Sequence, residues 1–347
     1  MEIIRSNKTK INDVEFKKLS FGKTFTDHMF LCEFKDGKWN SPKIIPYDNF
    51  SISPASSVFH YGQAIFEGMK AYKDNDNNVW LFRPEENYNR LNKSCERMCM
   101  PKIEKDLFFN GIKELLTIDK DWIGKGDTTM YIRPVVFATE ATIVASPSKE
   151  FSFFILCSHA SAYYLNPLSV LIEDTFIRAA KGGVGYAKAA GNYAGSFYPT
   201  SLAIEKGFDQ IVWTDSVNHK LIEEAGTMNI FFRINNKLIT PEHTDTILDG
   251  VTRKSVITVA KDSGIDVEIR DIEVSEIIQE YENGNLTEVF GAGTAAVIAP
   301  ISSFGYKEKK YILKDIDDAF GPIIKKKITD IQNNLTEDKY NWRYQVI

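Results

Sequence analysis

The chain has 347 residues and a formal net charge of −5, with ordinary apolar and charged fractions for a folded protein. That length favours two domains over one compact core. The charge gives no reason to expect nucleic acid or an anionic membrane surface as a partner. Five scattered histidines without an HxxxH or HxH pair argue against a histidine metal site, so we expect no metal.

Neither a signal peptide nor a membrane span is expected from the sequence. The first residues, MEIIRSNKTKINDVEF, contain no apolar core segment, and no run of about eighteen apolar residues occurs in the chain. We therefore expect a cytoplasmic protein.

Strand-like and helix-like patterns are mixed in the first half of the chain. Residues 28–39 and residues 69–84 each predict a pair of strands joined by a polar turn. Residues 85–98 and 107–119 have the apolar spacing of helices. Residues 128–140 and 150–160 are strongly β-prone.

The pattern loosens around residues 161–170 and then resumes as strands and helices, two of the helices ending at a glycine. The predicted strands are residues 209–215, residues 265–272 and a hairpin over 229–240 that turns at Asn235-Asn236, and the predicted helices are residues 252–264, 274–284 and 321–334.

We interpret the loose segment as a connection between two α/β domains. The expected organisation is an amino-terminal domain over residues 1–160, an interdomain loop over 161–175 and a carboxy-terminal domain over 176–347.

Lys188 is the only charged residue of the stretch GGVGYAKAAGNYAGSFYP, which runs from Gly182 to Pro199. Glycines allow sharp bends and close backbone approach. A lysine held there would be partly desolvated, which lowers its pKa toward a nucleophilic free amine and suits a Schiff base. The alternative is a surface lysine on a glycine-rich loop.

Three further residues are candidates for binding an anion. Thr252, after Gly250, stands at the start of a predicted helix, where free amides and the helix dipole favour an anion. Thr294 follows a glycine in FGAGTAAV, and Arg90 on a helix could add a bidentate donor. Alternatively, Thr252 is only a helix cap and Thr294 only part of a turn.

Two adjacent glutamates, Glu223 and Glu224, end an apolar run before Gly226. Alternation along a strand sends them to opposite faces, so one could stay in water while the other points into a site. A buried carboxylate needs a cationic partner, and a protonated pyridine nitrogen would be one.

Several stretches carry a more specific signal, in this order along most of the chain: FGKTFTDHMF, ASSVFHYGQAIFEGMKAY, LFRPEENYNRLNKSCERMCMP, YIRPVVFATE, FIRAAKGGVGYAKAAGNYAGS, QIVWTD, IEEAGTMNIFF, LDGVTRKSVI and EVFGAGTAAVI. Together they resemble the branched-chain amino acid aminotransferases, which are pyridoxal 5′-phosphate enzymes of fold type IV.

The resemblance implies an α/β (α+β) fold of two domains with the cofactor in the cleft between them. It implies that Lys188 forms the Schiff base and also moves the substrate proton, that Tyr193 bonds the phenolic oxygen of the cofactor, and that Glu224 pairs with its ring nitrogen. It also implies a phosphate cradle, consisting of Arg90, Val251, Thr252 and Thr294.

The resemblance further implies a substrate pocket. Tyr61 and the backbone of Thr294 and Ala295 would receive the α-carboxylate, and Arg133 would accept the second carboxylate of glutamate. The wall around the substrate side chain would consist mainly of Phe21, Tyr61, Phe66, Tyr131, Tyr163 and Thr227. The chain departs from relatives in two respects. Residues 296–299 read AVIA where some relatives have CxxC, and the interdomain segment SAYYLNPL is shorter than in the animal enzymes of the family.

The implied reaction is a ping-pong transfer of the amino group of L-leucine, L-isoleucine or L-valine to 2-oxoglutarate, in a protein that forms at least a homodimer. In that family, part of the first domain of one subunit closes the substrate pocket of the other. Alternatives on the same scaffold are a D-amino acid aminotransferase and an aminodeoxychorismate lyase. A protein that only holds the cofactor is an alternative of another class.

Overall fold

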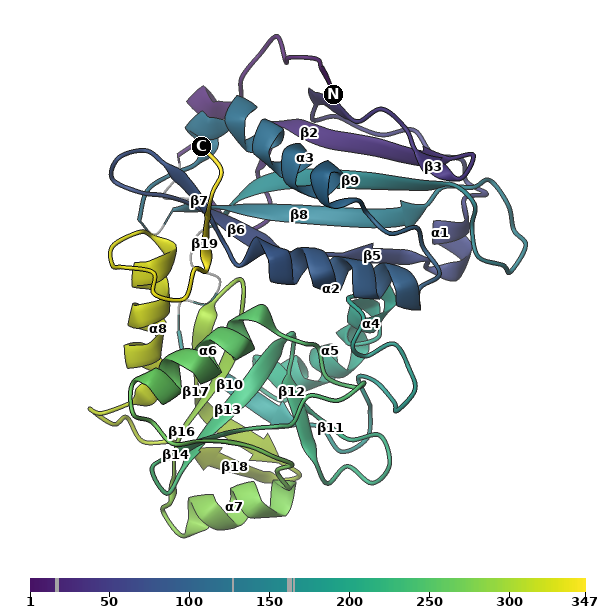
Figure 1. Cartoon of the computed structure of the whole chain (residues 1–347). Helices are drawn as coiled ribbons and strands as arrows, with labels where there is room; N and C mark the ends of the chain where they lie inside the picture. Colours follow the sequence, from purple (N-terminus) through teal and green to yellow (C-terminus); the bar gives the residue numbers. More distant parts are fainter. Residues whose placement is uncertain (16–18, 127, 161–163, 165) are drawn as a thin grey trace. The chain divides into compact units, whose positions relative to one another are not determined.

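A computed structural model of the chain describes residues 1–15, 19–126, 128–160, 164 and 166–347, which form two compact units (Figure 1). Unit 1 comprises residues 1–163 together with Ala187–Gly191 and Ile331–Ile347. Unit 2 comprises Tyr164–Tyr186 and Asn192–Asp330.

This division differs from the expected domain boundaries in two ways. The segment around Lys188 and the chain end after residue 330 belong to unit 1, although both were expected in the second domain. The expected interdomain loop over 161–175 contains strand β10 (Leu168–Ile172), which pairs inside unit 2. Both differences arise from pairing between segments far apart in sequence.

Unit 1 is built on a sheet that has ten strands within the described residues, in the order β1-β4-β2-β9-β8-β6-β7-β19, with β3 beside β2 and β5 beside β8. The pairs are antiparallel except β1 with β4. The strands are β1 (Glu2–Ile3), β2 (Phe25–Lys35), β3 (Lys38–Trp39), β4 (Lys43–Pro46), β5 (Ala64–Phe66), β6 (Met69–Lys73), β7 (Val79–Phe82), β8 (Thr129–Ala138), β9 (Phe151–Ala160) and β19 (Arg343–Gln345).

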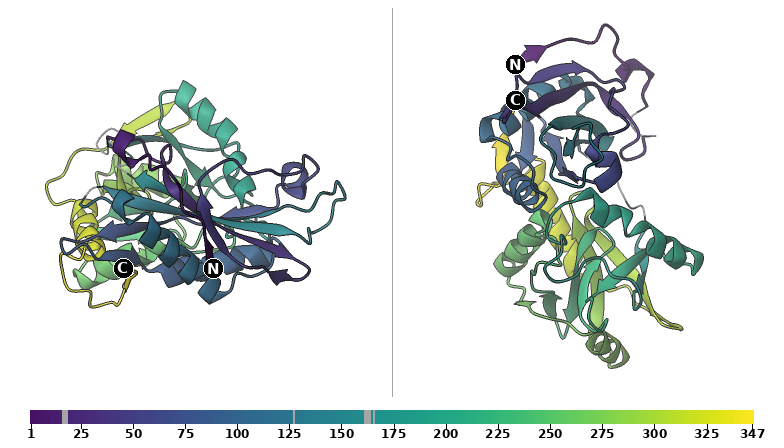
Figure 2. Two further views of the ribbon diagram at one scale, coloured as in Figure 1. Left: turned by 90° about the horizontal axis from the view of Figure 1, so that it is seen from above. Right: turned by 90° about the vertical axis from the view of Figure 1, so that its right-hand side faces the viewer.

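Helices α2 (Pro84–Arg97) and α3 (Lys105–Ile118) lie on the same side of this sheet (Figure 2). Helix α2 buries residues at helical spacing, among them Asn87, Arg90, Leu91 and Ser94. Leu91 joins the apolar core with strand residues such as Ile132. The buried face of α2 is therefore apolar in part, and it also carries three polar side chains, those of Asn87, Arg90 and Ser94. Helix α1 (Ser57–Tyr61) and two short 3-10 helices, Ile11–Asp13 and Lys120–Trp122, complete the unit.

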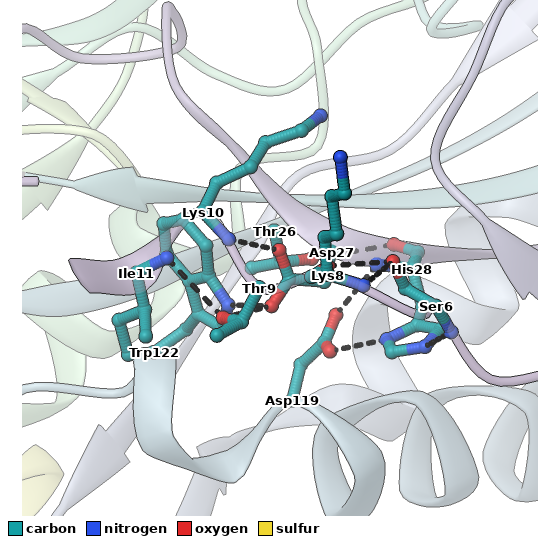
Figure 3. A network of polar contacts seen from close by, with 10 residues as sticks. All are labelled: Ser6, Lys8, Thr9, Lys10, Ile11, Thr26, Asp27, His28, Asp119 and Trp122. Carbon is teal, nitrogen blue, oxygen red and sulfur yellow. Dashed lines mark hydrogen bonds and ion pairs between the residues drawn. The ribbon is translucent and has the colours of Figure 1, made fainter. Parts of the chain in front are cut away.

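A polar network holds the amino-terminal segment onto this unit (Figure 3). Asp27 accepts bonds from the Thr9 hydroxyl at 2.6 Å and from the Trp122 indole at 2.9 Å. His28 Nε2 accepts the amide proton of Ser6 at 2.9 Å, while Nδ1 lies 2.6 Å from Asp119. Because Nε2 accepts a hydrogen bond from Ser6, the ring proton lies on Nδ1, which donates a hydrogen bond to Asp119.

Unit 2 is built on a second sheet, nine-stranded within the described residues, in the order β12-β11-β10-β17-β16-β13-β14-β15, with β18 beside β17. Because β12 also pairs with β13, six of these strands close into a ring. The other strands are β11 (Gln210–Thr214), β12 (Ile222–Ala225), β13 (Met228–Ile234), β14 (Lys237–Thr240), β15 (Val267–Ile269), β16 (Leu286–Gly293), β17 (Val297–Tyr306) and β18 (Lys309–Ile312).

Local sequence signals account for several turns of unit 2. Asn235 and Asn236 have φ angles of 48° and 63°, so the hairpin turns where the sequence predicted. Gly264 at φ 77° follows helix α6 (Val251–Asp262). The remaining helices are α4 (Ala190–Ala194), which begins in unit 1, α5 (Phe197–Glu205), α7 (Val274–Glu282) and α8 (Phe320–Gln332). Across the described residues, every helix is too short or too polar to traverse a lipid bilayer.

Candidate active site

Lys188 is half-buried and lies in a segment that pairs with unit 1. Its backbone carbonyl accepts the amide of Phe66 at 3.1 Å, and its own amide donates to the Ser94 hydroxyl at 2.9 Å. The neighbouring Ala189 forms a β-bridge with Ile65. The lysine amine lies 4.7 Å from the centre of the Phe66 ring. These contacts fix the backbone of Lys188 and place its amine against an aromatic ring.

Four of the predicted substrate residues gather around Phe66. The Arg133 guanidinium lies 4.5 Å from the Phe66 ring centre and 5.2 Å from that of Tyr131, whose hydroxyl accepts a bond from it at 3.1 Å. Phe21 packs edge-on against Tyr131 at 4.8 Å. Gly68 permits this arrangement, because a Cβ there would stand 2.0 Å from the Tyr131 hydroxyl.

Arg133 has a buried Nε atom with no hydrogen-bond partner among the described residues. A buried donor without a partner costs free energy, which indicates a position prepared for an acceptor. The arrangement, an arginine and a tyrosine hydroxyl beside aromatic rings, can therefore take either an apolar chain or a carboxylate.

Arg90, predicted to bind phosphate, is buried on helix α2 and held by Glu67. Its Nε donates to Oε1 of Glu67 at 2.6 Å and its Nη2 to Oε2 at 2.9 Å. The carboxylate also accepts Asn87 Nδ2 at 2.8 Å. The sequence analysis assigned no role to Glu67, although a carboxylate in the apolar, glycine-containing stretch AIFEGMKAY is the same kind of signal that singled out Lys188.

Another predicted substrate residue, Tyr61, contacts a different segment. Tyr61, at the end of helix α1, is 45% exposed, and its hydroxyl donates to the carbonyl of Ile143. Tyr163 lies outside the described residues. Lys70, which the sequence analysis did not name, is buried and stands directly opposite Tyr131 in the pairing of β6 with β8.

Unit 2 contains a pocket that brings together three of the predicted residues. Tyr193, Glu224 and Thr227 line it, with Arg178, Asn192, Ser196, Gly226 and Leu248. Glu224 is buried, its Oε2 lies 2.8 Å from Arg178 Nε, and its Oε1 accepts the Leu248 amide at 2.8 Å and Asn229 Nδ2 at 3.1 Å. Bonds of this kind favour the ionised form of a carboxylate.

The burial of the neighbouring Glu223 differs from what we expected. We expected one of the two glutamates to stay in water, but both are buried, at 7% and 3% exposure. Glu223 Oε1 accepts the Thr246 hydroxyl at 2.6 Å. Burial raises the pKa of Glu223 to about 7, reinforced by the charges of Glu224 and Asp215 and opposed by Thr246 and Arg178. Both faces of β12 are therefore covered by other segments of unit 2.

Arg178 and Asn229 are functional candidates that the sequence analysis missed. Arg178 Nη2 donates to the carbonyls of Gly185 and Thr246, which fixes the guanidinium that faces Glu224. At Gly185, a Cβ would stand 2.8 Å from the Thr246 backbone, so that glycine allows the close approach. Its signal in the sequence is a cation four residues before the glycine-rich stretch that begins at Gly182.

The predicted anion-binding residues of unit 2 lie where a helix begins and where two strands are joined. Val251 and Thr252 are the first residues of α6, whose Gly250 N-cap makes no side-chain cap bond. Asn229 links this helix start to Glu224, because its Nδ2 also donates to Leu248 O at 3.0 Å and a Cβ on Gly250 would meet its Oδ1 at 1.9 Å. Thr294 and Ala295 lie in the turn between β16 and β17.

Comparisons with known proteins identify the family to which the chain is similar. The model of the amino-transferase class IV family matches residues 64–304. A Staphylococcus aureus (strain N315) protein named probable branched-chain-amino-acid aminotransferase is 45% identical over 337 residues, which are 94% of this chain and 93% of that protein.

Two solved structures share the fold. The branched-chain aminotransferase of Thermoproteus uzoniensis with norvaline has a TM-score of 0.77 at 23% identity, over 92% of this chain and all of that chain. The branched-chain amino acid aminotransferase of Thermobaculum terrenum in its PLP-form has a TM-score of 0.74 at 23% identity, over 92% of this chain and 98% of that chain.

The chain therefore belongs to the class IV aminotransferases and, within them, to the branched-chain-amino-acid aminotransferases. The cofactor of this class is pyridoxal 5′-phosphate. The residues present fit that group, since the chain offers a half-buried amine, a buried guanidinium, a helix start without a side-chain cap and a buried carboxylate held by an arginine. Among the described residues, no cluster of three or more potential metal ligands occurs.

Proposed function

We propose that this protein transfers the amino group of L-leucine, L-isoleucine or L-valine to 2-oxoglutarate, in a ping-pong reaction that gives branched 2-oxo acids and L-glutamate. The observation that carries the proposal is the group formed by Lys188, Phe66, Tyr131 and Arg133, which combines an amine, an apolar wall and a carboxylate receptor. A substrate pair that is apolar in one half-reaction and acidic in the other needs all three.

Lys188 has two tasks in this proposal. Its Nζ is the nucleophile that holds the cofactor, and once released it takes the proton from the substrate Cα and returns it during the reverse half. The contacts that fix its backbone support both tasks, because they limit the positions open to the amine. When bound, pyridoxal phosphate supplies an aldehyde for the amino group and a ring that accepts electrons.

The other proposed cofactor residues hold charge. Glu224, which lies beside Arg178 and accepts two amide donors, would hold a proton at the ring nitrogen. Tyr193, which lines the same pocket, would bond the phenolic oxygen. Arg90, Val251, Thr252 and Thr294 would bind phosphate, with support from the N-terminal end of α6.

Substrate selection would depend on the aromatic group of unit 1. Leucine requires only the apolar wall of Phe21, Phe66 and Tyr131, with Thr227 from unit 2. Glutamate in addition requires a partner for a desolvated carboxylate, and Arg133 has a buried donor to offer. Tyr61, Tyr163 and the backbone of Thr294 and Ala295 remain proposed substrate contacts.

We also propose that the protein is a cytoplasmic homodimer. Three large apolar side chains near Tyr61 are strongly exposed, namely Phe59 at 61%, Ile143 at 69% and Val144 at 62%. Exposed apolar groups of this size favour a protein partner, and a second copy would cover them. Sedimentation of the purified protein tests this, and a monomer at micromolar concentration would contradict it.

The experiment for the reaction is a set of half-reactions with purified protein and pyridoxal phosphate. L-Leucine, L-isoleucine, L-valine and L-glutamate should each remove the visible absorbance of the bound cofactor, and 2-oxoglutarate should restore it. Reaction with D-alanine or aminodeoxychorismate but not with L-leucine would support the alternatives on the same scaffold. No spectral change with any of these would indicate a protein that only holds the cofactor.

A further inference from the structure

The backbone of Lys188 belongs to a closed ring of contacts in unit 1. Its carbonyl accepts the Phe66 amide at 3.1 Å, and the next residue, Glu67, binds the Arg90 side chain at 2.6 and 2.9 Å. The Arg90 carbonyl accepts the Ser94 hydroxyl at 3.0 Å, and that hydroxyl accepts the Lys188 amide at 2.9 Å. The ring therefore joins the proposed nucleophile to the proposed phosphate ligand.

Three side chains from one stripe of helix α2 converge on this ring. Asn87, Arg90 and Ser94 are all buried and lie three and four residues apart, which places them on one helix face. Asn87 donates to Glu67 Oε2 at 2.8 Å and to the Gly68 carbonyl at 3.2 Å. The amide of Gly68 donates to Glu67 Oε2 at 3.0 Å. Four donated bonds thus fix both oxygens of one carboxylate.

Glu67 is fully buried, at 0% exposure. Burial by itself would raise its pKa, but the Arg90 charge and bonds, the Lys188 charge and the Asn87 bond together hold the pKa below its ordinary value. The two cations that act on it come from two elements, Arg90 from α2 and Lys188 from the segment Ala187–Gly191. The carboxylate is therefore an anion shared by one buried cation, Arg90, and one half-buried cation, Lys188.

We propose that Glu67 is the positioning residue of this active site: its carboxylate sets the plane of the Arg90 guanidinium and supplies the counter-charge of Lys188. The inference rests on the proposed function, because it assigns those two residues to the cofactor. Glu67 itself would touch neither substrate nor cofactor. Its effects would pass through Arg90, by orientation, and through Lys188, by charge.

The two effects make separate predictions. An anion near Lys188 stabilises the protonated form of its nitrogen, so removing the anion should lower the pH at which that nitrogen is half protonated. Two parallel bonds to Glu67 fix the orientation of the Arg90 guanidinium. A shorter side chain at position 67 should therefore disturb Arg90, although the negative charge remains.

Glu67→Gln and Glu67→Asp separate charge from orientation. Each variant is prepared without cofactor, its fold is checked by thermal unfolding, and pyridoxal phosphate is then titrated to obtain Kd. The visible absorbance of the loaded protein is followed against pH. We expect Glu67→Gln to lower the pH midpoint by about one unit and to weaken binding. We expect Glu67→Asp to keep the midpoint and to weaken binding roughly ten-fold, since one bond to Arg90 is lost.

Glu85→Gln is the matched control. Glu85 lies at the start of the same helix, its side chain is 58% exposed, and it pairs with Lys105 at the surface. The substitution removes the same charge from the same unit, so it should leave both the pH midpoint and Kd at wild-type values.

The outcomes separate this inference from the proposed function. A wild-type chain that gains no visible absorbance with pyridoxal phosphate would contradict the proposed function itself. If the wild type binds normally and Glu67→Gln matches Glu85→Gln in midpoint and Kd, Glu67 is not a positioning residue. If Glu67→Gln does not fold, Glu67→Asp decides, because an unchanged Kd in that variant would contradict the proposal.

Discussion

The two units arrange buried charge in opposite ways. In unit 1 a single carboxylate, Glu67, serves two cations, Arg90 and Lys188. In unit 2 a single arginine, Arg178, is ion-paired with Glu224 and also acts on the charge of Glu223. At Glu67 one carboxylate therefore faces two cations, whereas at Arg178 one guanidinium faces two carboxyl groups.

This difference teaches which ligand groups each unit suits. The two cations around Glu67 suit an anionic ligand group, whether phosphate or carboxylate. The two carboxyl groups near Arg178 suit a protonated nitrogen. Ligand groups of the right sign should therefore stabilise each unit, and removal of one charge should affect one function at a time.

Lys188→Ala should have the largest effect, because the nucleophile and the proton carrier are lost together. Turnover should fall by several orders of magnitude, measured as glutamate formed from leucine and 2-oxoglutarate. Lys181→Ala changes an exposed lysine directly before the same glycine-rich stretch; it serves as the control and should keep wild-type turnover. Comparable losses in the two variants would mean that the stretch matters only for folding.

Arg133→Gln should act on one substrate class. It removes the cation beside Tyr131 and Phe66, so the KM for glutamate and 2-oxoglutarate should rise about ten-fold or more, equivalent to about 1.4 kcal/mol. Leucine half-reactions should change far less, because the apolar wall remains. Single-turnover measurements with each amino acid separate the two effects. Equal losses for both substrates would show that Arg133 supports the scaffold instead of contacting the substrate.

Glu223→Gln should have the smallest effect, on stability and not on chemistry. With a folded-state pKa of about 7 against an ordinary 4.5, the folded protein binds more protons than the unfolded one between these pH values, so wild-type stability falls as pH rises through that window. The variant avoids this loss, which is at most about 3 kcal/mol.

Thermal unfolding measures this difference. Glu223→Gln should unfold a few degrees above wild type at pH 8 and at the same temperature near pH 4.5. Glu282→Gln, at the exposed end of α7, removes the same charge and should unfold like wild type at both pH values. A variant less stable than wild type at pH 8 would mean that Glu223 is ionised and well paired.

Much of the local structure could be predicted from the sequence because its causes are local. The β-prone composition of β8 and β9, the helical spacing in α2, the Asn235-Asn236 turn and Gly264 after α6 depend on neighbouring residues. The fold type and family were predicted from the motifs, and the family match confirms them.

Long-range pairings could not be predicted in this way. Nothing near Lys188 in sequence indicates that its backbone pairs with Phe66 and Ser94, and nothing after α8 indicates that β19 joins β7. The same holds for Glu67 with Arg90 and for Arg178 with Glu224, because each ion pair joins distant segments. In the sequence, such an ion pair is indicated only by a charged residue in an apolar, glycine-containing stretch.

The most direct test of the central claim is to locate the cofactor on the chain. The protein is loaded with pyridoxal phosphate, reduced with borohydride and digested, and the labelled peptide is sequenced by mass spectrometry. The account predicts one label, on Lys188. A label on Lys181 or Lys206, or none on a protein that transaminates leucine, would contradict it.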